Sequence, residues 1–128
     1  MNRPARILVV DDDEKIRNTI KTILEDEGYI VDLAATGKEA IKRTEETAYN
    51  LALVDIRLPD IDGVDLLKLM KEAVPRTRKI IVTGYHHYRN AIAALNKDAD
   101  AFLIKPIDIG KLLNTVKEQL QLQENEKG

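Results

Sequence analysis

Acidic residues directly follow two of the apolar runs in this sequence. Asp11 and Asp12 come after the first run, and Asp55 comes after a later one. Carboxylates that share one cleft repel one another, and a divalent cation such as Mg²⁺, held by carboxylates, a carbonyl and waters, relieves that repulsion. The same ion neutralises phosphate oxygens and favours an in-line phosphoryl transfer. A carboxylate beside it is a nucleophile that can form an acyl phosphate, and Asp55 is the candidate for that role.

Thr83 and Lys105 also follow apolar runs, and their side chains suit a phosphate. A lysine supplies a point charge and a threonine hydroxyl supplies a donor. Each residue alone has a simpler explanation, Asp55 or Thr83 as a helix cap and Lys105 as a surface lysine. Asp13 is better interpreted as a cap. The joint occurrence of such residues after different apolar runs favours a phosphoryl site.

Five short apolar runs alternate with segments of helical spacing along the chain. The runs, which are predicted as buried parallel strands, are 7–10, 29–34, 51–54, 79–82 and 101–104. The segments with apolar residues at helical spacing are 16–24, 36–47, 64–70, 91–95 and 112–120. Gly28 ends the first helix, and Asp62 and Asp108 cap later ones.

This alternation predicts an α/β fold with helices on both faces of a parallel sheet. Five strands suit the doubly wound, flavodoxin-like (βα)₅ sandwich with the strand order 2-1-3-4-5. Ligands of such sheets bind outside the carboxyl ends of the strands. Because the first and third strands are neighbours in this order, Asp11, Asp12 and Asp55 are expected to lie close together.

These residues resemble the receiver domain of two-component response regulators, and the resemblance covers about residues 5 to 120. The motifs that carry it are Ile7-Leu8-Val9-Val10-Asp11-Asp12, Asp55 followed by Leu58-Pro59-Asp60 and Asp62-Gly63, Val82-Thr83-Gly84, and Lys105-Pro106. The resemblance implies a phosphoacceptor that a sensor histidine kinase or phosphotransfer domain loads, and that signals to a downstream output domain or protein. It implies no enzyme activity beyond the domain's own phosphorylation and dephosphorylation.

The resemblance also implies a role for each matching residue. Asp55 is the phosphoacceptor and a ligand of Mg²⁺. Asp12 is a direct ligand, Asp11 acts largely through water, and the main-chain carbonyl of Arg57 is a further ligand. Lys105 pairs with the phosphoryl oxygens.

The remaining implied roles concern switching. Thr83 moves to hydrogen-bond the phosphoryl group, and Phe102 stands where the family has an aromatic side chain that turns inward. Phe102 also suits a plain core position. The Lys105-Pro106 peptide bond is expected to be cis, which only an X-Pro bond adopts at low cost. The surface that changes is expected to comprise the fourth helix, the fifth strand and the fifth helix.

Two bulky residues flank the expected acyl phosphate. Arg57 comes two residues after Asp55, and Tyr85 comes two residues after Thr83. We hypothesise that both shield the phosphoryl group from water and slow its loss. The adjacent pair His86-His87 is a poor single metal site, because neighbouring residues on a helix face different directions.

The composition restricts the remaining possibilities. With 44% apolar and 33% charged residues, the 128-residue chain is globular and of single-domain size. We predict a receiver domain at 1–120 and a polar tail, or the start of a linker, at 121–128, which frays. The sequence has no apolar run long enough to span a membrane, and its start, Met1 to Arg6, is short and polar, unlike a signal peptide, so a cytoplasmic protein that does not enter membranes is expected. The absence of cysteine excludes disulfides and thiolate metal sites but does not by itself fix the compartment. A net charge of −2 gives no reason for direct nucleic-acid binding, and the basic cluster Arg76, Arg78 and Lys79 is assigned to a solvated loop.

Two other functions compete with the receiver. A haloacid-dehalogenase-like phosphohydrolase would use Asp11-Asp12-Asp13 as its Asp-x-Asp motif, but it leaves Asp55 unexplained and lacks a later acidic pair. A pseudo-receiver would be a binding module that never takes phosphate, and the intact set of site residues opposes it.

Overall fold

The computed structural model describes residues 3–84 and 98–126. The predicted helix at 91–95, Tyr85 and His86-His87 lie outside the described residues. The strands are β1 (Arg6–Val10), β2 (Ile30–Ala34), β3 (Leu51–Asp55), β4 (Arg78–Gly84) and β5 (Ala101–Lys105). The described helices are α1 (Glu14–Asp26), α2 (Gly37–Glu46), α3 (Gly63–Ala73) and α5 (Ile109–Glu126).

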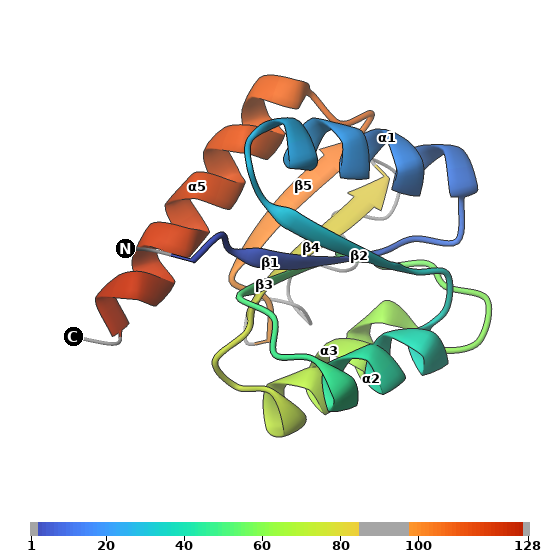
Figure 1. Cartoon of the computed structure of the whole chain (residues 1–128). Helices are drawn as coiled ribbons and strands as arrows, with labels where there is room; N and C mark the ends of the chain where they lie inside the picture. The colour runs from blue at the N-terminus through green and yellow to red at the C-terminus, as the bar shows by residue number, and fades with distance from the viewer. Residues whose placement is uncertain (1–2, 85–97, 127–128) are drawn as a thin grey trace.

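The five strands form one parallel sheet in the order β2-β1-β3-β4-β5, as the sequence predicts (Figure 1). β1 lies between β2 and β3, and its last residue, Val10, pairs with Ala34 on one side and Val54 on the other. The carboxyl ends of β1 and β3 are therefore level with each other. This register places the residues that come directly after Val10 and Val54 at the same edge of the sheet.

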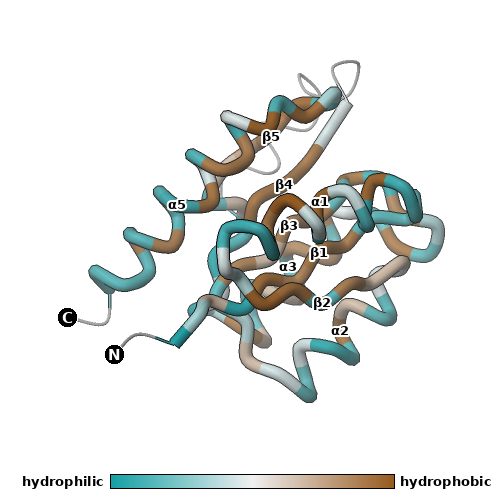
Figure 2. Tube along the Cα trace, turned by 45° about the horizontal axis from the view of Figure 1, so that its top comes forward, coloured by the Kyte–Doolittle hydropathy of each residue, from teal (hydrophilic) through white to brown (hydrophobic). Residues whose placement is uncertain are grey.

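Alternate side chains of the strands enter two separate cores. Leu8 and Val10 contribute to the core under α2 and α3, while Ile7 and Val9 contribute to the core under α1 and α5. The two helix pairs cover opposite faces of the sheet (Figure 1). The apolar residues concentrate in the strands, and the outer faces of the helices are hydrophilic (Figure 2). Burial on both faces explains why the central strands β1, β3 and β4 contain continuous apolar runs.

Short polar side chains begin the helices as expected. Asp13 accepts hydrogen bonds from the main-chain N–H groups of Lys15 and Ile16 at the start of α1, which confirms it as a cap. Asp62 caps α3 in the same way. Gly28 follows α1 with a φ of 93°, a left-handed conformation that favours glycine.

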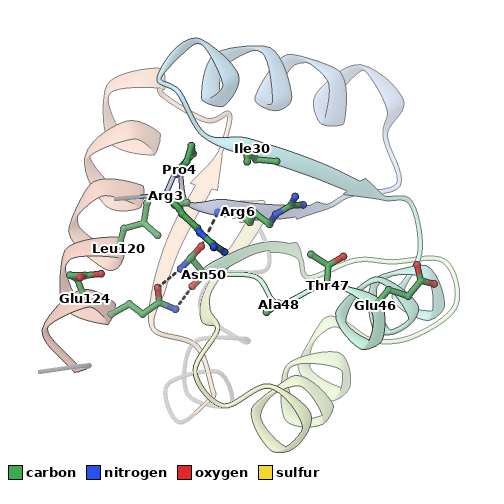
Figure 3. Close-up of a pocket in the computed structure, with 12 residues that line it drawn as sticks. Arg3, Pro4, Arg6, Ile30, Glu46, Thr47, Ala48, Asn50, Leu120 and Glu124 are labelled. Atoms are coloured by element: carbon green, nitrogen blue, oxygen red, sulfur yellow. Dashed lines mark hydrogen bonds between the residues drawn. The ribbon is translucent and has the colours of Figure 1, made fainter. Parts of the chain in front are cut away.

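The expectation that the tail frays is wrong for residues 121–126, which continue α5 to Glu126. The reason is a polar seam made by Gln119 and Gln123, which are buried against the amino ends of the strands. Gln123 Nε2 donates to the main-chain oxygens of Asn50 and Arg76, both at 2.8 Å, and Gln123 Oε1 accepts from Asn50 Nδ2 at 2.9 Å. Figure 3 shows the bonds to Asn50 beside the groove that α5 borders.

The assignment of the basic cluster to a solvated loop is wrong for Arg78 and Lys79, and the strand predicted at 79–82 already contained Lys79. Arg78 and Lys79 belong to β4, and Lys79 is buried. Its Nζ donates to the carbonyls of Val74 and Thr77, at 2.9 and 2.6 Å. Burial lowers the pKa of Lys79. Arg78 hydrogen-bonds Gln119, so this basic residue holds α5 to the sheet.

Among the described residues, none of the helices is both long and apolar enough to span a membrane.

Candidate functional site

The carboxylates of Asp11, Asp12 and Asp55 lie at one edge of the sheet, with one oxygen of each within 4.8 Å of the others. The level ends of β1 and β3 bring them there, as the sequence predicts. Asp11 and Asp55 are buried and Asp12 is exposed. The cluster is thus open to solvent on the side of Asp12.

Lys105, the last residue of β5, reaches this cluster from two strands away. Its Nζ lies 2.9 Å from Asp55 Oδ2 and 3.3 Å from Asp11 Oδ2. Burial lowers the pKa of Lys105, but the hydrogen bond and charge of Asp55, together with the charge of Asp11, outweigh burial and leave the pKa raised. The ammonium is therefore retained beside the carboxylates. The Lys105-Pro106 bond is cis, as the resemblance implies.

Asp11 is the least solvated member of the cluster. Burial raises the pKa of Asp11, and the charge of Asp55 raises it further, against the opposing effects of the Asp13 N–H group and Lys105. The carboxylate form of Asp11 is therefore disfavoured until a cation offsets its charge.

Each carboxylate oxygen of Asp55 accepts a hydrogen bond. Oδ2 bonds to Lys105, and Oδ1 accepts from the main-chain N–H of Arg57 at 3.0 Å. The loop that follows is closed tightly, because Gly63 N donates to Ile56 O at 2.9 Å. A Cβ at Gly63 would lie 2.5 Å from Ile56 Cα, so the chain needs glycine there. The loop after β3 thus fixes the orientation of the Asp55 carboxylate.

Asp60 links the loop after β3 to α2. Its two carboxylate oxygens accept from the N–H groups of Gly37 and Lys38, each at 2.9 Å, at the start of α2. These hydrogen bonds, Lys38 first and then Gly37, lower the pKa of Asp60. The sequence marks Asp60 as part of a motif without indicating this contact, since the two segments are distant along the chain.

Thr83 and Phe102 occupy neighbouring strands. Thr83 follows Val82, the residue that pairs with Asp55, and is fully buried. Its hydroxyl donates to the Gly84 carbonyl at 3.3 Å rather than to a member of the acidic cluster. Phe102 is partly buried and packs against the core under α2 and α3. Tyr85 lies outside the described residues.

Sequence reasoning missed Arg17. This residue is half-buried on α1, and one nitrogen of its guanidinium donates to the main-chain oxygen of Asp11 at 2.7 Å. The only available signal is spacing, since Arg17 stands six residues after Asp11 and just past the helix cap Asp13.

The donor set suits a small hard cation. The acidic cluster offers carboxylate oxygens alone, which Mg²⁺ prefers to nitrogen or sulfur. The open side at Asp12 leaves room for the waters that Mg²⁺ usually keeps. Lys105 balances only part of the negative charge of the three carboxylates, so a cation would be favoured electrostatically.

Comparison with known proteins gives one consistent family. The model of the response regulator receiver domain matches residues 7–117. The transcriptional regulatory protein ZraR of Klebsiella oxytoca is 39% identical over 89% of this chain. The regulatory protein AtoC of Escherichia coli is 34% identical over 95%. The chain spans only 26% of the length of either relative.

Solved structures agree with the sequence comparison. A CheY-like response regulator receiver domain protein from Methanospirillum hungatei is 45% identical, with a TM-score of 0.91 over 97% of this chain and 99% of its own. A receiver domain protein from Clostridium thermocellum is 30% identical, with a TM-score of 0.87 over 94% of this chain and 97% of its own. Both are similar in fold along nearly their whole length.

Proposed function

The chain belongs to the response regulator receiver domain family, which accepts phosphoryl groups in two-component signalling, and on this premise we propose that Asp55 is its phosphoacceptor. The observation that carries the proposal is the placement of the Lys105 ammonium 2.9 Å from Asp55 Oδ2, at an edge where further carboxylates gather. A phosphoryl group on Asp55 would meet a cation already in place. Asp11 is also buried at this edge, but it lies farther from the same lysine, at 3.3 Å.

The metal that this family implies fits the residues present. Asp11, Asp12 and Asp55 would hold Mg²⁺, and the main-chain carbonyl of Arg57 would be a further ligand. When bound, Mg²⁺ would neutralise the carboxylates and the oxygens of the incoming phosphoryl group.

The transfer itself needs few protein groups. An oxygen of Asp55 attacks phosphorus of a phosphohistidine, the P–N bond breaks, and the electron pair stays on the imidazole nitrogen. Attack by a carboxylate requires no general base. The main-chain N–H of Arg57 and the Lys105 ammonium orient the carboxylate. The tasks of the chain are therefore orientation and charge balance.

Phosphorylation then changes the balance between two states. The phosphoryl group adds charge and acceptor oxygens beside Lys105, and the Thr83 hydroxyl is expected to leave the Gly84 carbonyl for it. Phe102, half-buried on β5, is expected to turn inward as Thr83 moves. Reversing a 1:99 equilibrium takes about 5.5 kcal/mol, which a few charge-assisted bonds of about 1.5–3 kcal/mol can supply.

The surface that changes would be the predicted helix around 91–95, β5 and α5. The helix around 91–95 lies outside the described residues, so its part is a prediction from the family alone. The expected partners are a sensor histidine kinase or phosphotransfer domain upstream and an output domain or protein downstream. A cytoplasmic location, the boundary near residue 120, and the absence of other enzyme activity stay predictions.

Arg57 and Tyr85 are expected to set the lifetime of the acyl phosphate. Both are bulky, and both follow a residue of the site at a spacing of two. Replacing both by alanine should speed phosphate loss, because water then reaches phosphorus more easily. An unchanged half-life of the acyl phosphate in the double variant would contradict the shielding hypothesis.

Stoichiometry tests the proposal against its alternatives. With acetyl phosphate and Mg²⁺, the receiver should take up one phosphoryl group per chain and should not turn over generic phosphomonoesters. Sustained turnover of a phosphomonoester would favour a phosphohydrolase that uses Asp11. Failure to label with either acetyl phosphate or beryllofluoride would favour a pseudo-receiver.

A further inference from the structure

The carboxylate of Asp12 is positioned differently from those of Asp11 and Asp55. Asp11 and Asp55 are buried and bonded to Lys105, whereas Asp12 is exposed. Within the described part of the chain, the carboxylate of Asp12 makes no hydrogen bond or ion pair. Its place in the cluster must therefore come from the main chain of the loop that carries it, residues 11–13.

Side chains close this loop at both of its ends. Asp11 Oδ1 accepts from the main-chain N–H of Asp13 at 2.9 Å, which folds the loop over Asp12. Asp13 Oδ1 in turn accepts from Lys15 N at 2.9 Å and Ile16 N at 3.2 Å. Asp11 is thus bonded to Asp13, and Asp13 is bonded to the first turn of α1.

Arg17 completes the closure. Its guanidinium donates to Asp11 O at 2.7 Å, while its own main-chain N–H donates to Asp13 O at 3.0 Å. The bond to Asp11 is charge-assisted and comes from a planar group that is half-buried on α1. One residue therefore contacts the loop on each side of Asp12.

We propose that Arg17 is a positioning residue of the metal site, holding the 11–13 loop so that the Asp12 carboxylate stands ready for a divalent cation. This inference rests on the proposed function, since it concerns the same site. It adds a residue that acts through the Asp11 main chain rather than by touching the cation or the phosphoryl group.

Positioning and plain electrostatics predict opposite results when Arg17 is removed. The guanidinium is a positive charge near a cation site, so its loss should tighten Mg²⁺ binding if charge alone counted. If Arg17 holds the loop, its loss should weaken Mg²⁺ binding, because Asp12 would have to be ordered when the ion binds. Loss of a residue that orients a metal ligand usually weakens affinity by about 10–100-fold.

The experiment is a Mg²⁺ titration of the folded protein by calorimetry or by amide NMR shifts of residues 11–17. Wild type, Arg17→Met and Arg17→Lys are compared with the control Lys15→Met. Lys15 is exposed on the first turn of the same helix, and its side chain makes no bond to the loop. Arg17→Met should bind Mg²⁺ about tenfold or more weakly. Arg17→Lys should fall between, and Lys15→Met should bind at least as tightly as wild type.

A second readout separates positioning from general damage. With acetyl phosphate as donor, Arg17→Met should need more Mg²⁺ for half-maximal phosphorylation but should approach the wild-type rate at saturating Mg²⁺. A damaged fold would lower the rate at every Mg²⁺ concentration, and that result would overturn the proposal. If Arg17→Met does not fold, Arg17→Gln is judged by the same two measurements.

The outcomes distinguish this inference from the proposed function. If wild type itself shows no Mg²⁺ binding, the metal site fails and the inference fails with it. If wild type binds and Arg17→Met binds equally or more tightly, only the role of Arg17 is overturned. Weakening by Lys15→Met as large as that by Arg17→Met would also overturn it.

Discussion

The Lys105 ammonium lies 2.9 Å from Asp55 Oδ2 and 3.3 Å from Asp11 Oδ2, so one cation from β5 serves carboxylates that follow two other strands. The contact spans β4, which lies between β3 and β5. The pairing offsets part of the repulsion among the acids before any ion or phosphoryl group arrives. It also sets the Lys105 nitrogen where phosphoryl oxygens on Asp55 would need a partner.

Replacing Lys105 with methionine should separate metal binding from phosphoryl acceptance. Removing a positive charge beside a cation site should tighten Mg²⁺ binding, by about tenfold. Phosphorylation by acetyl phosphate should nevertheless slow, since the phosphoryl oxygens lose their cationic partner. Calorimetry measures the first effect and a phosphorylation time course the second.

Lys111→Met is a matched control, because Lys111 is an exposed lysine of α5. It should change neither quantity. Weaker Mg²⁺ binding in Lys105→Met would contradict the account, since it would mean that Lys105 shapes the metal site rather than competing with the ion.

Asp11→Asn should stabilise the metal-free protein at neutral pH. Burial and the charge of Asp55 raise the pKa of Asp11 above its unfolded value, so the folded state binds the proton more tightly. The ionised form therefore lowers stability above the folded pKa, and that penalty disappears as the pH falls toward 3.8. We expect a gain of about 0.5–2 kcal/mol at pH 7, in the range of single stabilising changes.

Urea denaturation between pH 7 and pH 4 measures this prediction. The advantage of Asp11→Asn should shrink on acidification, and Mg²⁺ should stabilise wild type more than the variant. An advantage that stays constant with pH would show that the ionisation of Asp11 is not its source.

Gly63→Ala should destabilise the loop after Asp55. A Cβ at Gly63 would lie 2.5 to 2.9 Å from main-chain atoms of Ile56, which the 2.9 Å bond between Gly63 N and Ile56 O holds in place. Overpacking of this kind costs about 1–3 kcal/mol. Gly110→Ala is the control, since its Cβ would meet only Asp108 Oδ2, at an ordinary 3.6 Å.

Thermal or urea unfolding should therefore give a lower free energy of unfolding for Gly63→Ala than for Gly110→Ala. Gly110→Ala should be neutral or stabilise by up to about 1 kcal/mol, because alanine suits a helix better than glycine. Equal stability of the two variants would mean that the loop yields to the new methyl group.

Gln123→Ala should loosen the end of α5. The substitution leaves Asn50 Nδ2 and the Arg76 carbonyl without their Gln123 partner, at a cost of about 1–3 kcal/mol, while the Asn50 carbonyl still accepts from Arg78 N. Amide hydrogen exchange of residues 119–126 should rise. The exposed Gln121→Ala should change stability by less than about 0.5 kcal/mol. Slow exchange at the end of α5 in Gln123→Ala would indicate that helix propensity alone sustains it.

The central strands could be predicted from the sequence because β1, β3 and β4 are buried on both faces, and the alternation of strands with helices then favoured the doubly wound order. Residues 7–10 and 51–54 read as continuous apolar runs for that reason, and the acids after them mark the carboxyl edge. Since parallel strands end at a common edge, the gathering of Asp11, Asp12 and Asp55 could be predicted without coordinates.

Contacts between polar side chains and distant main chain could not be predicted in this way. Gln123 bonds to Asn50 across 73 positions, and Asp60 bonds to Gly37 across 23. Neither contact has a periodic or motif signal, because any polar residue on an exposed face would give the same sequence pattern. The sequence pattern of residues 121–126 therefore gives no sign that they continue α5.

Locating the phosphoryl group on the chain tests the central claim most directly. Wild type and Asp55→Asn are incubated with acetyl phosphate and Mg²⁺, and peptide mass spectrometry locates the adduct. The account predicts one base-labile phosphoryl group on the peptide that contains Asp55, and none on Asp55→Asn. An adduct at Asp11 or Asp12 in wild type, or undiminished labelling of Asp55→Asn, would contradict it.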